Sequence, residues 1–464
     1  REHWRDILAC PVVLWMPPYI ARRFDALARD FGSWVSHRLE FNTADALAEA
    51  ASSPPLPPPG LELDMAGNER RVLELGQRLD RALGRGERAV ALRVLAELFD
   101  LEFLLGRLDG AEQHGLQWQA LSMEAEDPLA VARSQDRLGL ILYTRGDLDG
   151  AEAMYRKALA IHEALGRKEG MANDYGNLGT VLLTRGNLDG AEAMYRKAFA
   201  IHEELDDAVG MASDYGNLGI ILRHRGDLDG AEAMHRKALA IDEALGHKEG
   251  MANHYGNLGV ILDTCGDLDG AEAMYRRALA IDEALGRKAG MANHYGNLGI
   301  VRQTRGDLDG AEAMYRKALT IDEELGSKGG MASDYGSLGN VVQARGDLDG
   351  AEAMYRKALA IHEELGDKAG MANDYGNLGT VLLTRGDLGG AEAMYRKALA
   401  INEELGRKEG MGNQYTNLGV IAKQRGDVDG ARRLWTLARD LFAQMGAKPN
   451  RDLVQSWLDG LPPQ

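Results

Sequence analysis

Histidine and aspartate at equivalent places in the sequence are the side chains that could support metal chemistry. His254 and His294 lie forty residues apart, and Asp214 and Asp334 stand forty residues before and after them. Imidazole and carboxylate groups both bind Zn²⁺ in proteins. If these positions belong to neighbouring helical units, they lie roughly 10 Å apart, because that is the packing distance of helices, and one ion cannot join them. We therefore expect His254 and His294 to be solvated surface residues, and we predict no metal site.

No other arrangement of residues indicates catalysis. The sequence contains no recognisable Ser-His-Asp or Cys-His pairing and no carboxylate dyad, and the P-loop pattern G-x-x-x-x-G-K-[ST] is absent. Cys10 and Cys265 lie far apart and match no metal or disulfide spacing, which is typical of a reducing cytosol. We therefore predict a cytoplasmic protein with no catalytic residues and no cofactor.

A forty-residue phrase is repeated along most of the chain and must position whatever site the protein has. One copy starts at Gly170 and reads GMANDYGNLGTVLLTRGNLDGAEAMYRKAFAIHEELDDAV. Further copies start at Gly210, Gly250, Gly290, Gly330, Gly370 and Gly410. A fixed period of this size is typical of a solenoid, in which each unit buries its apolar face against its neighbours.

Each unit is predicted to fold as two helices. In the copy from Gly170, one helical face of the first helix, helix A, carries Tyr175, Leu178, Val181 and Leu182. Helix A should end at Arg185-Gly186, because glycine is a usual helix stop and a basic side chain complements the C-terminal dipole. The second helix, helix B, should begin after an aspartate or asparagine N-cap, at Asp147, Asn187, Asp227 or Asp267. Its buried stripe should be Leu188, Ala191, Tyr195, Ala198 and Ile201.

These residues resemble the tetratricopeptide repeat, whose pattern is a large residue, Leu-Gly, a second large residue, then Ala, aromatic, Ala. Here the pattern is Tyr175, Leu178-Gly179, Leu182, Ala191, Tyr195 and Ala198, and it recurs in seven consecutive copies. The forty-residue period is similar to that of the LGN/Pins polarity adaptors and the kinesin light chains, which bind extended peptide segments of their partners. The resemblance implies an all-α, right-handed α-solenoid of helical hairpins.

Two glycines of helix A indicate close packing. Gly179 should let helices A and B approach, and a larger residue there should overpack, at a cost on the order of 1 to 3 kcal/mol. Gly176 is less expected, since glycine inside a helix costs about 0.5 to 1 kcal/mol relative to alanine. Its recurrence predicts close backbone contact with a neighbouring helix or with a ligand.

The domain organisation follows from where the repeat is regular. We expect an α/β-like segment at 1–51, a proline-rich linker at 52–67, degenerate leading helices at 68–129, the regular array at 130–448 and a capping helix at 449–464. The first segment resembles the closing part of the P-loop ATPase domain that precedes repeat arrays in signalling ATPases of the STAND class. That resemblance implies the sensor or adaptor part of a larger bacterial signalling protein, and the alternative is a free-standing assembly scaffold on which the segment acts as a cap.

Differences among the copies point to a binding surface. Helix B hardly varies, whereas helix A varies at the positions equivalent to Thr180, Leu183 and Thr184, where tetratricopeptide proteins usually contact partners. We predict that these positions, with the Asn173 position, line a concave face that binds a protein or an extended peptide; drift at solvated positions is the alternative. The candidate partner-binding residues are Asn173, Ser213, Arg223, His224, Asn253, Asp263, Asn293, Gln303, Ser333, Asn340, Gln343, Asn373, Lys423 and Gln424.

The Asn173 position holds only asparagine or serine in the regular copies. An asparagine side chain could hold a peptide backbone through its paired donor and acceptor. It could equally cap the N-terminus of helix A. Arg302 replaces the usual leucine, so we expect it to snorkel or to find a carboxylate.

Composition limits the classes of partner. The net charge is −17 and no basic run stands out, which argues against nucleic acid or an anionic membrane. The carboxylate clamp of chaperone-binding relatives needs Lys or Arg where Gly176 and Thr180 stand, so a chaperone adaptor is not expected. The prediction is a protein-binding or peptide-binding scaffold.

Overall fold

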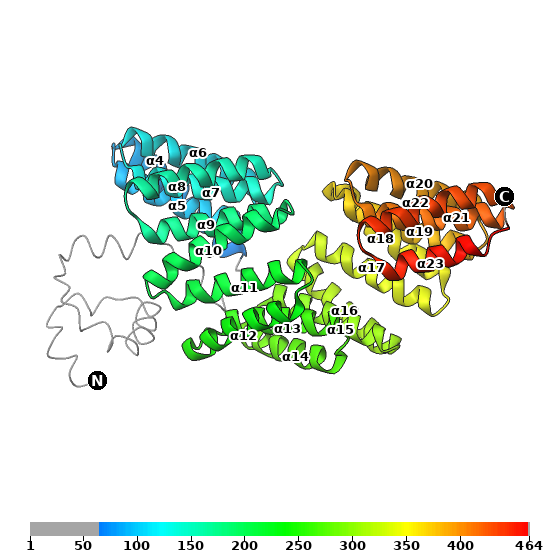
Figure 1. The fold of residues 1–464 in the computed structure, drawn as a ribbon. Helices are drawn as coiled ribbons and strands as arrows, with labels where there is room; N and C mark the ends of the chain where they lie inside the picture. Colours follow the sequence, from blue (N-terminus) through cyan, green and yellow to red (C-terminus); the bar gives the residue numbers. More distant parts are fainter. Residues whose placement is uncertain (1–64, 463–464) are drawn as a thin grey trace. The chain divides into compact units, whose positions relative to one another are not determined.

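The computed structural model describes residues 65–462, and in this part of the chain every regular element is an α-helix (Figure 1). The predicted α/β-like segment at 1–51 lies outside the described residues, as does most of the proline-rich linker at 52–67. The first described helix begins at Met65, inside the range that we expected to be linker. No helix in the described part of the chain is long and apolar enough to cross a membrane.

The helices alternate between the two kinds that the repeat predicts. Three leading helices are α4 (Met65–Gly84), α5 (Arg88–Leu104) and α6 (Leu108–Glu124). The A helices are α7 (Pro128–Thr144), α9 (Lys168–Thr184), α11 (Ala208–His224), α13 (Lys248–Thr264), α15 (Lys288–Thr304), α17 (Lys328–Ala344), α19 (Lys368–Thr384) and α21 (Lys408–Gln424). The B helices are α8 (Leu148–Ala164), α10 (Leu188–Glu204), α12 (Leu228–Leu245), α14 (Leu268–Leu285), α16 (Leu308–Leu325), α18 (Leu348–Leu365), α20 (Leu388–Glu404) and α22 (Val428–Gln444). The final helix is α23 (Lys448–Asp459).

The turn between helices A and B follows the predicted chemistry. Helix α9 ends at Thr184, and Gly186 takes a left-handed φ of 79°, which glycine adopts at little cost. Helix α10 then starts with Asn187 as its N-cap, and the Asn187 side chain accepts a hydrogen bond of 3.0 Å from the Gly190 N–H. Asp147, Asp227 and Asp267 cap their helices in the same way, so the predicted N-caps are confirmed.

Within one repeat, helices A and B pack through small residues. Ala191, Tyr195 and Ala198 of α10 are buried, as predicted. A Cβ atom at Gly179 would lie 2.7 Å from the Tyr195 ring, closer than real Cβ contacts. Glycine is therefore required at this position because the tyrosine of helix B packs directly on the helix A backbone.

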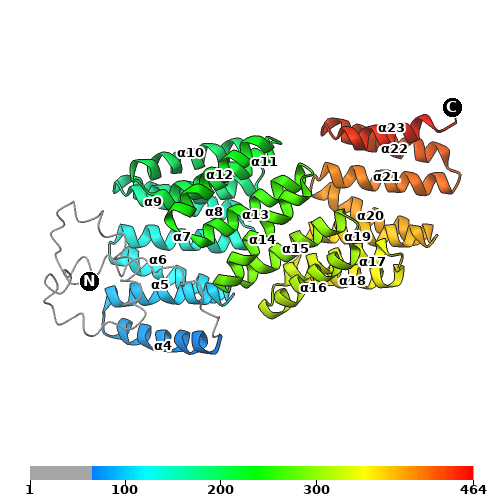
Figure 2. The same ribbon diagram turned by 90° about the horizontal axis from the view of Figure 1, so that it is seen from below.

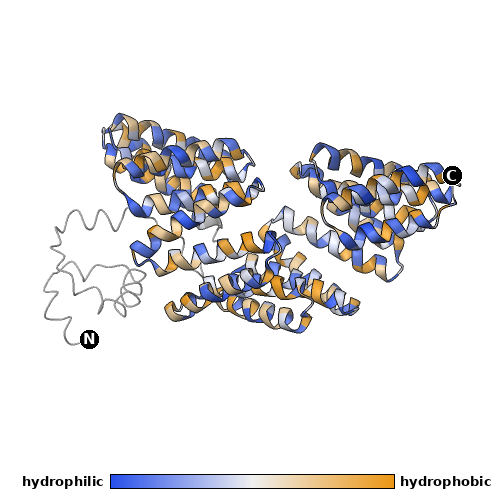
Figure 3. Cartoon of the chain, viewed as in Figure 1, coloured by the Kyte–Doolittle hydropathy of each residue, from blue (hydrophilic) through white to orange (hydrophobic). Residues whose placement is uncertain are grey.

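Between repeats, each helix B packs on the helix A that follows it. One buried cluster, for example, joins Ala191 and Tyr195 of α10 to Leu218 and Ile221 of α11. Helices A of neighbouring repeats also contact each other, as α11 does with α13 and α13 with α15 (Figure 2). Apolar and polar residues alternate around each helix, as expected for elements that share small cores with both neighbours (Figure 3). The described helices form an all-α solenoid.

Candidate functional site

The predicted partner-binding residues all lie on helices A. The asparagines and serines of the Asn173 position are exposed, and so are His224, Asn340, Lys423 and Gln424. Arg223, Asp263, Gln303 and Gln343 are half-buried. Because helices A of neighbouring repeats contact each other, equivalent positions form lines that run from repeat to repeat.

The Asn173 position does not cap helix A. Helix α9 begins at Lys168 with Arg167 as its N-cap, so Asn173 lies inside the helix. The capping interpretation is therefore wrong. Asn253 accepts a hydrogen bond of 3.3 Å from Arg287 of the next repeat. Farther along, a polar hollow of about 440 Å³ is lined by Asn373, Asn402, Arg407, Lys408, Glu409, Gly410, Asn413 and Gln414. Asparagines of the Asn173 position therefore face a polar hollow that spans two repeats.

Some of the variable residues have partners inside their own repeat. The hydroxyl of Tyr355 lies 2.7 Å from the side chain of Asn340 and 2.8 Å from that of Gln343, within hydrogen-bond distance of both. The hydroxyl of Tyr315 donates to Gln303 at 3.1 Å. In the repeats that carry leucine at the Leu183 position, threonine takes over this role, since Thr180 lies 3.0 Å from the Tyr195 hydroxyl and Thr380 lies 3.1 Å from that of Tyr395. Part of the variation on helix A therefore serves the buried tyrosines.

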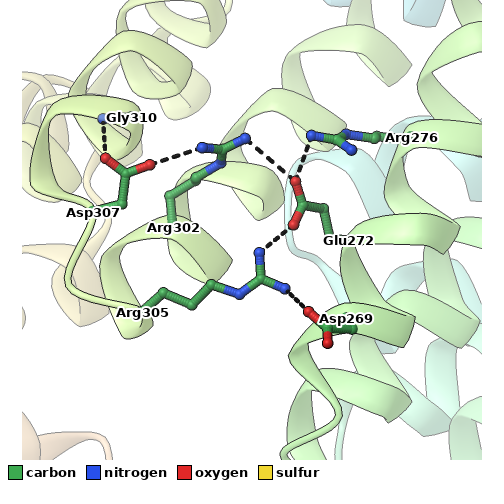
Figure 4. Close-up of polar contacts among 7 residues, drawn as sticks. All are labelled: Asp269, Glu272, Arg276, Arg302, Arg305, Asp307 and Gly310. Atoms are coloured by element: carbon green, nitrogen blue, oxygen red, sulfur yellow. Dashed lines mark hydrogen bonds and ion pairs between the residues drawn. The ribbon is translucent and has the colours of Figure 1, made fainter.

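Arg302 finds two carboxylates, as predicted. Its guanidinium donates to Asp307 at 2.7 Å and to Glu272 of the preceding repeat at 3.3 Å (Figure 4). Asp307 is also the N-cap of α16 and accepts from the Gly310 N–H at 2.9 Å. Arg302 first, and then this N–H, lower the pKa of Asp307. Arg302 therefore links the start of one helix B to the previous helix B.

A second arginine, at the end of helix A, repeats through the array. Arg225 donates to Asp189 and Glu192 of the preceding helix B, each at 2.5 Å. Arg145, Arg185, Arg305, Arg345 and Arg385 form the same pair of ion pairs. Cys265 replaces this arginine in one repeat and is exposed. We call this arginine with its two carboxylates the interrepeat clamp.

The prediction that His254 and His294 are solvated surface residues is wrong. Both side chains are buried, with an exposed fraction of 7% each. The Nε2 atom of His254 lies 3.3 Å from Asp242, and that of His294 lies 3.2 Å from Asp282. Both histidines face the preceding helix B. Burial lowers the pKa of His254, and the nearby Asp242 carboxylate opposes this effect.

These contacts belong to a column of buried polar pairs that sequence reasoning missed. His162 lies 2.7 Å from Asp174, and His202 lies 2.6 Å from Asp214. In the next two repeats the two residue types change places, so that aspartate lies on helix B and histidine lies on helix A. The signal was present in the sequence: histidine and aspartate alternate between two positions twelve residues apart.

The same column accounts for the glycine inside helix A in some of the repeats. A Cβ atom at Gly216 would lie 2.8 Å from the His254 ring, and one at Gly256 would lie 2.8 Å from the His294 ring. We expected this glycine to contact either a neighbouring helix or a ligand, and at Gly216 and Gly256 the contact is with a neighbouring helix. At Gly176, where the facing residue is Asp214, no other atom of the described residues lies within 4 Å of the Cβ position.

Comparison with known proteins identifies the repeat. The family model described as tetratricopeptide repeat matches residues 129–204, 170–244, 210–284, 250–324 and 331–404. A search of curated protein sequences gives no significant match.

Several solved structures are similar to the chain. A Rap protein complexed with competence and sporulation factor has a TM-score of 0.52 at 17% identity, and the match covers 80% of this chain and 97% of that one. A STAND protein with a tetratricopeptide repeat sensor from Pyrococcus horikoshii has a TM-score of 0.52 at 14% identity, covering 74% of this chain and 55% of that one. BtubC (BKLC) from P. vanneervenii is 25% identical over 48% of this chain and 91% of its own, with a TM-score of 0.40. At 17% and 14% identity, the first two similarities show a shared fold.

Proposed function

Since the chain belongs to the tetratricopeptide repeat family, we propose that its helices A bind an extended peptide segment of a partner protein. A tetratricopeptide array is a protein-interaction scaffold, and this fold typically carries no catalysis. The proposed surface is concave and is formed by the lines of residues on successive helices A. The net charge of −17 supports a protein partner over nucleic acid or an anionic membrane.

The observation that carries the proposal is the line of exposed asparagines and serines at the Asn173 position. An amide side chain offers a donor and an acceptor, which match the alternating groups of a peptide backbone. Helices pack roughly 10 Å apart and an extended peptide rises about 3.3 Å per residue, so each repeat would hold about three peptide residues.

The similar structures support a sensor or adaptor role. The Rap protein is seen with competence and sporulation factor, and the repeats of the STAND protein are described as a sensor. We propose that this array is the sensor or adaptor part of a larger, cytoplasmic signalling protein. A free-standing assembly scaffold is the second candidate. A P-loop in the coding sequence upstream of Arg1 would support the first role.

Selection from a random peptide library tests the proposed surface. Peptides of about sixteen residues are selected on the wild-type array, and their affinities are then measured for a variant with Asn253→Ala, Asn293→Ala and Asn373→Ala. These side chains are exposed, so the variant should unfold at the wild-type temperature. We expect peptide affinity to fall tenfold or more.

A matched control carries three exposed changes on helices B, namely Arg196→Ala, Arg356→Ala and Arg396→Ala. This control should bind the selected peptides as tightly as the wild-type protein does. Equal peptide binding by the asparagine variant and the wild-type protein would show that the Asn173 line is not the binding surface.

A further inference from the structure

Three consecutive helices bring two aspartates and a histidine together near the start of the regular array. Asp136 comes from α7, His162 from α8 and Asp174 from α9. One ligand atom of each side chain lies within 4.8 Å of the others. In the described part of the chain, this is the one place where three histidine, cysteine or acidic side chains meet in this way.

The cluster is largely buried, and one oxygen atom of each aspartate lacks a hydrogen-bond partner among the described residues. Asp174 has an exposed fraction of 0% and His162 one of 4%. The Oδ2 atom of Asp174 faces the Nδ1 atom of His162 at 2.7 Å. The Oδ1 atoms of Asp136 and Asp174 are also buried, yet neither has a hydrogen-bond partner among the described residues. A buried acceptor without a partner is unfavourable, so a cation or a proton must compensate it.

Burial shifts the pKa values of the side chains in the cluster. Burial first, and the Asp174 carboxyl second, raise the pKa of Asp136, while His162 and Arg137 oppose this effect. Burial also raises the pKa of Asp174. The guanidinium of Arg137 is already bound to Asp100 at 2.9 Å. Burial also lowers the pKa of His162, while Asp136 opposes this effect.

Asp136 is an exception to the repeat. In the next six copies its position holds Gly176, Gly216, Gly256, Gly296, Gly336 and Gly376, and in the last copy it holds Thr416. The pair of His202 and Asp214 has the same geometry as that of His162 and Asp174, but it faces Gly176. The array therefore does not require a third side chain to hold a His–Asp pair, and the second carboxylate at Asp136 needs an explanation of its own.

We propose that Asp136, His162 and Asp174 bind one divalent metal ion of the zinc type. One imidazole nitrogen and two carboxylate oxygens form a ligand set that Zn²⁺ accepts, with water in the remaining position. The cation would neutralise the two facing carboxylates and satisfy their free oxygens. It would join three helices at the first regular repeat. Asp136 is half-buried, whereas His162 and Asp174 are buried.

Calorimetric titration of the chelator-treated protein with Zn²⁺ at pH 7 tests the proposal, with the d–d spectrum of bound Co²⁺ as a second readout. Excess Mg²⁺ is present to suppress weak surface binding. We expect one tight equivalent per chain and a release of protons, because the metal displaces a proton held by the carboxyl pair. Bound Zn²⁺ should also raise the unfolding temperature.

The chain supplies its own control. Asp136→Gly converts the cluster to the arrangement already present at Gly176, His202 and Asp214, so the variant should fold. It should lose the tight equivalent, with affinity reduced at least tenfold, whereas His202→Ala should keep it. If the wild-type protein and the Asp136→Gly variant bind Zn²⁺ equally, or if the wild-type protein binds none, the proposal is wrong and the two carboxyl groups share a proton instead.

Discussion

At the scale of single residues, the polar pairs between repeats include one that departs from the others. Where the neighbouring repeats place histidine opposite aspartate, Asp322 of α16 faces Asp334 of α17, and both are buried. Burial first, and the Asp322 carboxyl second, raise the pKa of Asp334 to about 7. A carboxyl pair of this kind is stable only while it holds a proton.

The Asp322–Asp334 pair should make the stability of the array depend on pH. The pKa of Asp334 is higher in the folded state than its ordinary value of 3.8, so its contribution is complete below about pH 4 and is lost as the pH rises through about 7. Asp322→His restores the His–Asp pair seen at His362 and Asp374. We expect this variant to be stabilised by roughly 1 to 2 kcal/mol at pH 7.5 and by less at pH 5. Urea unfolding at both pH values measures the difference, and an equal effect at both would contradict the assignment.

Which residues could be predicted depended on whether their partners belong to the same pair of helices A and B. Gly179 was predicted because its partner, Tyr195, belongs to the same hairpin and the packing of helices A and B is a property of one repeat. The burial of His254 was not predicted because its partner, Asp242, lies on the helix B of the preceding hairpin, whereas we compared His254 only with equivalent positions of neighbouring repeats. The exchange of histidine and aspartate along the column was the available signal.

At the scale of helices, the sequence predicted where most elements begin and end. The left-handed glycine and the N-cap recur in each repeat, so the turn between helices A and B is determined by residues within a few positions of it. The capping helix was expected near 449–464 and is found at Lys448–Asp459. The interrepeat clamp was not predicted, since it joins the end of a helix A to the start of the previous helix B across more than thirty residues.

Because Cys265 replaces the arginine of the interrepeat clamp, this repeat can be used to measure how much the clamp contributes to the free energy of unfolding. Cys265→Arg should form ion pairs with Asp229 and Glu232 of the preceding helix B, equivalent to those that Arg225 makes with Asp189 and Glu192 and Arg305 makes with Asp269 and Glu272. Because the clamp is partly exposed, we expect a gain of only about 0.2 to 1 kcal/mol, and this gain should shrink at high salt. Thermal unfolding at 50 mM and 1 M NaCl checks both points. The reverse change, Arg305→Cys, should destabilise the array by a similar amount. If the stability gained by Cys265→Arg does not depend on salt, the gain comes from packing of the arginine methylene groups and not from the ion pairs.

At the scale of the whole array, stability should be a sum of neighbouring contacts. Each buried cluster is confined to a few successive helices, as in the one where Ala351 and Tyr355 of α18 join Leu378 and Val381 of α19. The same property limits what the sequence can say about function. The repeated scaffold could be predicted from one copy, whereas the partner depends on side chains of many repeats acting together, and no single repeat encodes it.

The final helix offers a test of this one-dimensional behaviour. Val454 and Leu458 of α23 are buried against Trp435 and Phe442 of α22. Val454→Asp with Leu458→Asp places two carboxyl groups in that core, which is unfavourable by several kcal/mol. In a globular domain the damage would spread to the whole molecule. Here we expect amide hydrogen exchange to accelerate in α21, α22 and α23 while protection of α9 to α12 stays at the wild-type level, because those helices share no contact with the altered core. Uniform loss of protection would mean that the array unfolds as one cooperative unit.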